Sequence, residues 1–217
     1  EASDAQAQAA LVTALARDGR PDAAHEQLDR LGALPGAPLP LVASARQELA
    51  DAAWRKGDTS AALAEYRSLV KQPLPPPTLR LLQVKLDALR SGGEQEYLLR
   101  ELLLGDGATQ TDGAYAVHLL RELRAVRPDG LALYLEARQL AFRQRFEPAA
   151  DLLRRSREMG LPSAPIRLEA LRMEATARVA TGQLQLAEEL WRSLAERPDP
   201  ALQVEANDFL LRIAHRR

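Results

Sequence analysis

One spacing recurs four times along the chain and constrains its fold more than any other feature. In each case a residue at a tight turn ends an apolar segment, and an alanine follows five positions later. The four pairs are Gly19 with Ala24, Gly57 with Ala62, Arg145 with Ala150, and Gly182 with Ala187. A small residue at this point lets two helices approach each other closely, so the pattern predicts helical hairpins that stack.

Other features repeat with the same phase. The turns are 38 residues apart from Gly19 to Gly57 and 37 residues apart from Arg145 to Gly182. A bulky side chain four residues after the alanine fills the space beyond it in three repeats, whereas Arg154 holds that place in the remaining one. The bulky residues are Leu28, Tyr66 and Trp191, and the exits carry Pro35, Pro73, Pro162 and Pro198.

The rest of the chain supports helices and no strands. Alanine, leucine, arginine, glutamate and glutamine dominate, and all of them favour helix, while only 4% of the 217 residues are aromatic. Apolar residues recur at the spacing of one helix face, as from Ala187 to Ala195. We expect an all-α protein with about twelve helices, at residues 4–17, 22–32, 40–56, 59–71, 77–91, 94–104, 112–126, 130–143, 147–159, 164–181, 184–196 and 200–214.

The repeat resembles the tetratricopeptide repeat, a helix–turn–helix unit of about 34 residues with glycine at the turn, alanine early in the second helix and proline at the end. The family's tryptophan in the first helix is absent, and Leu11-Val12 and Leu49-Ala50 stand where it has Leu-Gly. The chain is therefore similar to a divergent member. The resemblance implies a right-handed superhelix of antiparallel helix pairs, and a non-repetitive helical bundle is the alternative.

We expect residues 1–217 to form one solenoid with an irregular middle. Clear repeats cover about 5–38, 43–74, 131–163 and 168–199. The section 75–128 holds three expected helices where pairing needs an even number, so we expect a hinge or a change of curvature between about 72 and 128. The last helix, 200–214, is expected to cap the stack, with Val204, Phe209, Leu210 and Ile213 on the covered side and Glu205, Asp208 and Arg212 outside.

The segment 105–113 belongs to this irregular section. Its glycine and aspartate residues resemble a calcium loop, but the alternating oxygen ligands and terminal glutamate of an EF-hand are missing. We expect a plain interhelical loop in which Thr111 or Asp112 caps the next helix.

The chain begins with Glu1 rather than Met, and we expect a mature form or an excised domain.

Charge and residue types exclude several functions. With 29 basic and 30 acidic residues the chain has no net attraction for nucleic acid, and it has no cysteine for a disulfide, a thiolate site or a nucleophile. No apolar run is long enough to insert into a membrane. His25 with Asp29 and His118 with Glu122 supply only two ligands each, so we expect no metal and no cofactor.

No nucleotide-binding or hydrolase motif occurs, so we expect no enzymatic activity. An enzyme of unrecognised type remains an alternative, and it would need a cluster of perturbed carboxylates or histidines.

The resemblance implies that the first helix of each pair lines a concave groove that holds a peptide or a partner protein. The family's groove positions correspond to Gln47, Asp51, Trp54, Arg55, Leu135, Gln139, Phe142, Arg143, Arg172 and Thr176. Trp54 and Phe142 stand out because aromatic residues beside arginines dominate binding energy when an interface buries them. The alternative is that both are packing residues between repeats, as we expect for Trp191 and Tyr66.

We therefore expect a non-catalytic scaffold for protein–protein interaction, with self-association through an uncovered end as a further option. The clamp by which chaperone-binding members of the family grip a carboxylate needs asparagines, and the chain has only Asn207. Only three of the 29 basic residues are lysines, a bias that indicates GC-rich coding. GC-rich coding and the lack of cysteine are compatible with a bacterial protein, in periplasm or cytoplasm, and fold analogy suggests cell-envelope assembly or secretion. A regulatory sensor that binds a small ligand or a signalling peptide is the alternative from another class.

Overall fold

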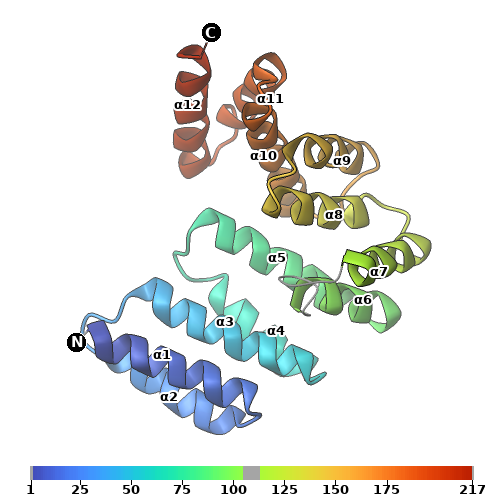
Figure 1. Cartoon of the computed structure of the whole chain (residues 1–217). Helices are drawn as coiled ribbons and strands as arrows, with labels where there is room; N and C mark the ends of the chain where they lie inside the picture. Colours follow the sequence, from blue (N-terminus) through green and yellow to red (C-terminus); the bar gives the residue numbers. More distant parts are fainter. Residues whose placement is uncertain (1, 105–112, 217) are drawn as a thin grey trace. The chain divides into compact units, whose positions relative to one another are not determined.

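The computed structural model describes residues 2–104 and 113–216, and this part of the chain is all-α, as predicted (Figure 1). Consecutive helices form antiparallel pairs that pack sequentially, an arrangement consistent with a helical repeat. The twelve helices of the described residues are α1 (Ala2–Arg17), α2 (Pro21–Ala33), α3 (Leu39–Arg55), α4 (Thr59–Leu69), α5 (Pro76–Ser91), α6 (Gly93–Leu104), α7 (Gly113–Val126), α8 (Leu131–Phe142), α9 (Phe146–Glu158), α10 (Ala164–Ala180), α11 (Leu184–Ala195) and α12 (Pro200–Ala214).

The chain divides into two compact units, Glu1–Leu104 and Gly105–Arg217. In the first unit α1 packs on α2 and α3, α3 on α4, and α5 on α4 and α6. In the second unit each helix from α7 to α12 packs on the next. Because α5 pairs with α6 and α8 with α9, α7 is the helix that strict pairing leaves over. The loop expected at 105–112 and the caps at Thr111 or Asp112 lie outside the described residues, and the hinge stays a prediction.

The turns share one backbone geometry, and it corrects the phase of the third repeat. Gly19, Gly57 and Gly182 have φ values of 81°, 84° and 74°, in the left-handed region that glycine adopts without steric cost. In the third turn this conformation belongs to Gln144, with φ of 59°, and not to Arg145, whose φ is −87°. The same two backbone hydrogen bonds close each turn. Gln144 N donates to Ala141 O and Arg145 N to Leu140 O, as Gly57 N donates to Trp54 O and Asp58 N to Ala53 O. The turn therefore lies one residue earlier than predicted.

With Gln144 as the turn residue, the repeats become uniform. Gly19 to Gly57 and Gln144 to Gly182 are both 38 residues apart. The small residues five positions after the turns are fully buried at 0% exposure: Ala24, Ala62, Ala149 and Ala187. The bulky residues four positions later are at most 2% exposed: Leu28, Tyr66, Leu153 and Trp191. Burial of such side chains contributes about 1.5–3 kcal/mol each, so these residues form the centre of the four repeated hairpins.

The corrected phase also removes the exception at Arg154. Leu153 fills the gap beside the alanine, while Arg154 is exposed and pairs with Glu158 at 2.8 Å on the same helix. The core positions of Tyr66 and Trp191 are confirmed. Sequence alone placed the turn at Arg145 because no glycine marks the true position.

The α8–α9 hairpin has one further close approach. Gly130 N, just before α8, donates to Gly160 O, just after α9, at 2.8 Å. A Cβ atom on Gly130 would lie 1.9 Å from Ser156 O, a distance that no side chain can accept. The glycine therefore lets the start of α8 meet the end of α9 backbone to backbone.

The last helix covers apolar surface on α10 and α11, as expected, and Phe209, Leu210 and Ile213 lie on the covered side as predicted. Leu202, Ala206 and Ile213 are at most 1% exposed, and Phe209 stacks on Trp191 with ring centroids 4.3 Å apart. Val204 is 72% exposed, so its predicted place on the covered side is wrong: two residues from Leu202 is more than half a helical turn away.

Candidate partner-binding groove

The corrected phase defines which positions of each first helix are equivalent. In the second repeat the predicted groove residues Gln47, Asp51, Trp54 and Arg55 lie 10, 6, 3 and 2 positions before the turn at Gly57. Counted from Gln144, the equivalent residues in the third repeat are Tyr134, Arg138, Ala141 and Phe142. The originally assigned Leu135 is 4% exposed and lies in the core, and Gln139 is half-buried.

Trp54 is fully buried, so it offers no surface to a partner in this structure. Its ring meets Tyr66 edge-on, with centroids 6.2 Å apart and an interplanar angle of 83°. Its indole N–H donates to Glu96 Oε1 on α6. This environment matches the alternative interpretation, in which Trp54 packs between helices.

Asp51 is likewise committed to contacts inside the first unit. Lys85 Nζ on α5 donates to both carboxylate oxygens of Asp51, at 2.6 and 2.8 Å, and the Tyr66 hydroxyl on α4 donates to Asp51 Oδ1. Asp51 and Lys85 are 5% and 3% exposed. Burial, together with the charge of Asp51, raises the pKa of Tyr66 well above its ordinary value, and burial lowers the pKa of Lys85. The cluster joins α3, α4 and α5.

Two predicted residues at the carboxyl end of α8 do lie on the surface. Phe142 is 77% exposed, and Arg143 beside it is exposed as well. The position two residues before the turn is exposed in all four repeats: it holds Arg17, Arg55, Phe142 and Ala180. Phe142 is thus exposed because of its place in the repeat.

The remaining predicted residues make polar contacts within their own units, and Arg172 joins two helices. Arg172 on α10 donates to Glu169 Oε2 at 3.2 Å and to Glu205 Oε1 on α12 at 2.7 Å. Thr176 is half-buried, and its hydroxyl donates to Arg172 O at 2.9 Å. In the first unit Arg55 Nε donates to Leu104 O at 3.3 Å. These polar groups hold the structure together in the absence of any partner.

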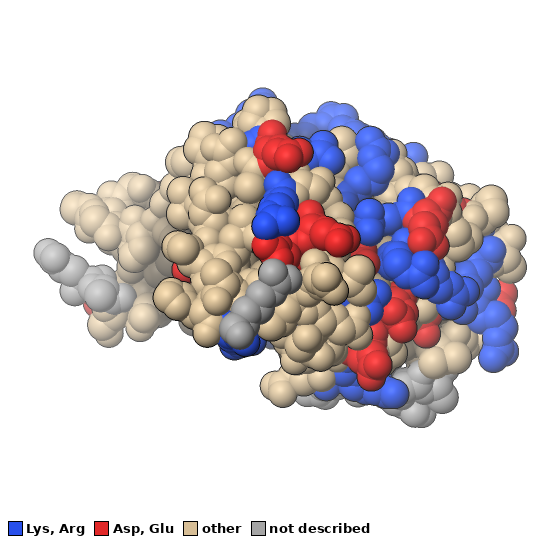
Figure 2. Space-filling model, turned by 90° about the horizontal axis from the view of Figure 1, so that it is seen from above, with Lys and Arg blue, Asp and Glu red and all other residues tan. Residues whose placement is uncertain are grey.

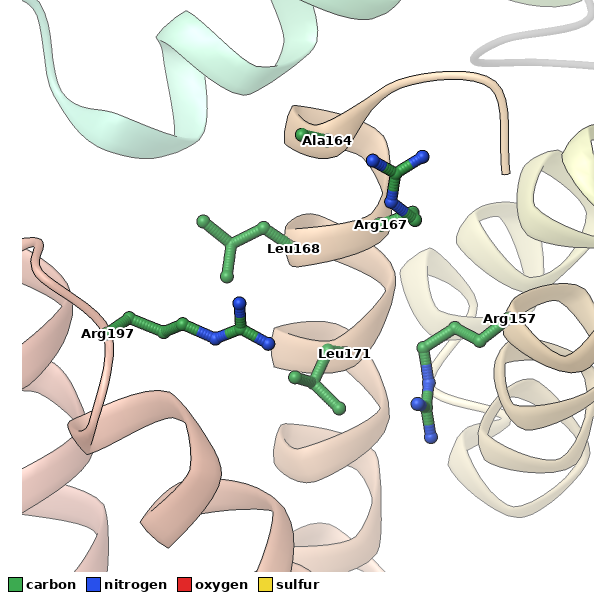
Figure 3. Close-up of a pocket in the computed structure, with 6 residues that line it drawn as sticks. All are labelled: Arg157, Ala164, Arg167, Leu168, Leu171 and Arg197. Atoms are coloured by element: carbon green, nitrogen blue, oxygen red, sulfur yellow. The ribbon is translucent and has the colours of Figure 1, made fainter. Parts of the chain in front are cut away.

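Two pockets open along the first helices. One, of about 190 Å³, lies where α3 meets the segment leading into α5, and the predicted residue Gln47 lines it together with Pro40, Ala43, Ser44, Leu69, Leu74, Pro75 and Thr78. The other, of about 310 Å³, surrounds the first half of α10 and is lined by Arg157, Ala164, Arg167, Leu168, Leu171 and Arg197 (Figure 3). Figure 3 shows Arg157 and Arg197 on opposite sides of α10, with the side chain of Arg197 extending toward this helix.

Sequence reasoning missed Lys85 and the three arginines of the second pocket. A signal existed for Lys85, because it lies between Leu82 and Leu89 on one apolar helix face, where a lysine must be paired. The arginines come from α9, α10 and the segment before α12, and no local pattern relates such distant residues.

Two of the three histidines each lie beside one carboxylate. His25 Nε2 lies 3.1 Å from Glu65 Oε1 on α4, rather than pairing with Asp29, and His118 Nδ1 lies 3.8 Å from Glu122 Oε1. Within residues 2–104 and 113–216 no three histidine, aspartate or glutamate side chains are grouped so that they could hold a metal ion. Among the described helices, none has the length and apolarity to cross a bilayer.

Basic and acidic side chains lie next to one another over the face shown in Figure 2, in keeping with the many ion pairs. No protein-family model, curated protein or solved structure matches the chain. Its helix pairs pack sequentially, and pockets lie along two of the first helices.

Proposed function

We propose that this chain is a non-catalytic scaffold for protein–protein interaction, a divergent tetratricopeptide-like solenoid that binds a peptide or a partner protein along its first helices. The observation that carries the proposal is that both pockets occupy the same place in the repeat. Ala43 in one pocket and Leu168 in the other each lie 14 residues before the turns at Gly57 and Gly182.

The equivalent placement suggests a surface that the repeat itself creates. Each pocket lies along the first half of a first helix and beside the segment that leads into the next first helix. Each combines apolar side chains with polar groups, the composition that peptide-binding grooves use for affinity and for register. The exposed ring of Phe142 adds an aromatic group of the kind that anchors interfaces.

Site-specific photo-crosslinking in the native source tests this proposal. A photoreactive residue replaces Gln47 or Leu168, which line the pockets, and matched controls replace Glu26 on α2 and Glu189 on α11, exposed residues of second helices. We expect a discrete crosslinked protein at the pocket positions, at least several-fold stronger than at the controls. Equal crosslinking at all four positions would contradict a groove along the first helices.

Substitution of an aromatic residue is a second test of the proposal, and the choice of residue decides what it reports. Trp54→Ala would remove a fully buried ring that packs on Tyr66, so lost binding would report unfolding rather than lost contact. Phe142→Ala is the informative aromatic variant because the ring is 77% exposed. We expect it to weaken partner capture while leaving the helical content unchanged.

A regulatory sensor is the second candidate, and the size of the α10 pocket favours it. A volume of about 310 Å³ falls at the lower end of the range that small ligands occupy. A sensor of this kind would bind a small anion at the arginines and change the curvature of the stack at the irregular section. Thermal stabilisation by small anionic metabolites, without any crosslinked protein, would favour the sensor over the scaffold. A setting in bacterial cell-envelope assembly or secretion is part of the scaffold proposal, and fractionation of the source cells tests it.

A further inference from the structure

The pocket on α10 concentrates positive charge beside apolar surface. Three of its six lining residues are arginines, and the described residues that line it include no carboxylate. The guanidinium groups come from three separate parts of the second unit: Arg157 from α9, Arg167 from α10, and Arg197 from the segment before α12. The chain as a whole is nearly neutral, so this concentration is local.

The three arginines retain donors for a ligand. Arg157 is held in place by Glu174, a 3% exposed carboxylate that accepts from its Nε at 2.9 Å and from its Nη2 at 2.6 Å. Arg167 Nη1 donates to Leu161 O at 2.9 Å. No carboxylate of the described residues pairs with Arg167 or Arg197, and a guanidinium has five N–H donors in all. Most of these donors therefore remain available.

The floor of the pocket is apolar. Figure 3 shows Leu168 and Leu171 on the face of α10 toward which the side chain of Arg197 extends. Leu171 belongs to the apolar core of the unit, while Leu168 is half-buried and packs at its edge. The cavity of about 310 Å³ has room for an apolar side chain lying on these leucines.

We propose that this pocket binds an acidic segment of the partner protein, with carboxylates on Arg167 and Arg197 and an adjacent apolar side chain on Leu168. This inference rests on the proposed scaffold function and specifies the chemistry of its partner. Guanidinium groups bind carboxylates through paired, charge-assisted hydrogen bonds, which are the stronger kind. The apolar floor favours a peptide over a phosphate polymer, which would leave the leucines uncovered.

The test measures binding of fluorescent peptides to the whole chain by anisotropy. The probe peptide alternates glutamate with leucine, and the two comparison peptides alternate glutamine with leucine and glutamate with serine. We expect the glutamate–leucine peptide to bind at least tenfold more tightly than either, because a charge-assisted hydrogen bond or a buried apolar side chain is worth about a factor of ten or more. Added salt should weaken its binding.

Two double variants of equal charge locate the site. Arg167→Gln/Arg197→Gln removes the two pocket guanidinium groups that pair with no carboxylate of the described residues, and Arg145→Gln/Arg155→Gln removes two exposed arginines outside the pocket lining. We expect the first to weaken binding of the glutamate–leucine peptide at least tenfold and the second less than twofold. Arg157 is left intact because it holds the buried carboxylate of Glu174.

Equal affinity for the glutamate and glutamine peptides, or equal losses in both double variants, would overturn the proposed acidic partner. The crosslinking experiment separates this failure from that of the scaffold. A crosslink at Leu168 that persists in the Arg167→Gln/Arg197→Gln variant would retain the scaffold and reject the acidic segment. Absence of any specific crosslink at Gln47 and Leu168 would reject the scaffold itself.

Discussion

Each unit joins a first helix to the following first helix by an ion pair, and the two pairs differ in burial. In the first unit Asp51 on α3 meets Lys85 on α5, and these side chains are 7% and 3% exposed. In the second unit Arg172 on α10 meets Glu205 on α12, and these are 16% and 31% exposed.

The difference determines what each unit can offer to a partner. A buried ion pair loses the hydration of both charges, so each partner depends on the other and neither is available to a ligand. A partly solvated pair is weaker and screened by salt, and its loss is tolerated. The first unit has therefore committed the charges of Asp51 and Lys85 to its interior, whereas the second keeps arginines at the surface of a pocket.

The largest expected effect follows from breaking the buried pair. Lys85→Met leaves the carboxylate of Asp51 buried without a cation, and we expect the first unit to lose about 3–5 kcal/mol of its free energy of unfolding. The measurement is urea unfolding in a Trp191→Phe background, monitored by the fluorescence of Trp54. Trp54 lies in the first unit and Trp191 in the second, so each tryptophan reports its own unit.

The triple variant Asp51→Leu/Tyr66→Phe/Lys85→Met is the control for that experiment. It removes every charged or polar member of the cluster and leaves an apolar contact in its place. We expect most of the lost stability to return, to within about 2 kcal/mol of the starting protein. A triple variant as unstable as Lys85→Met would mean that packing, rather than an unpaired charge, dominates.

Arg172→Met is the matched change in the second unit. It removes the cation that pairs with Glu205, whose side chain is 31% exposed and retains contact with water, and we expect a loss of about 1–2 kcal/mol. The measurement is urea unfolding in a Trp54→Phe background, monitored by the fluorescence of Trp191. The effect should shrink in high salt, unlike that of Lys85→Met. A loss as large as that of Lys85→Met would abolish the contrast between the two pairs.

Because of the Tyr66 hydroxyl, we expect the first unit to lose stability at alkaline pH. Its native pKa lies above the ordinary 10.0, so the native state keeps the proton at a pH where the unfolded chain releases it. The stabilising contribution is complete below pH 10 and is lost above it, at about 1.4 kcal/mol per pH unit. Urea titrations above pH 10 should show this slope, and Tyr66→Phe should lack it. Tyr97→Phe, which removes an exposed phenol, should behave like the starting protein.

The smallest expected effect concerns the turn of the second unit. The backbone of Gln144 is left-handed, with φ of 59°. This conformation costs a residue with a Cβ atom about 1–2 kcal/mol of free energy, and replacement by glycine removes part of that cost. We expect Gln144→Gly to raise the free energy of unfolding by about 1 kcal/mol, measured through Trp191. Gln144→Ala keeps the Cβ atom and should give no gain. Stabilisation by Arg145→Gly instead would restore the phase that the sequence suggested.

Periodicity predicted the helices well because it reports which face of a helix is apolar. The alanines and bulky residues of the hairpins follow directly from it, as do the short connections between successive helices within each unit. The third repeat was shifted by one residue because Gln144 carries no sign of its left-handed backbone.

Roles of individual side chains were harder to predict, because they depend on which helix lies opposite. Trp54 lies on the predicted face, yet Glu96, more than forty residues away, accepts its N–H and Tyr66 covers its ring. The arginines of the α10 pocket became neighbours only through the packing of α9, α10 and α12. Gln47 and Phe142, in contrast, lie at accessible positions, although the corrected phase makes Phe142 the equivalent of Arg55 and not of Trp54.

Gly130 and Phe142 stand at the two ends of the same short helix. At one end the backbone of α8 packs directly on the backbone of α9, with no side chain between them and a hydrogen bond joining the two. This contact restricts movement of one helix of the hairpin against the other. At the other end the phenyl ring projects into solvent. A partner that docks on this ring would therefore meet a stiff arm, and the entropy lost on binding would fall mainly on the partner.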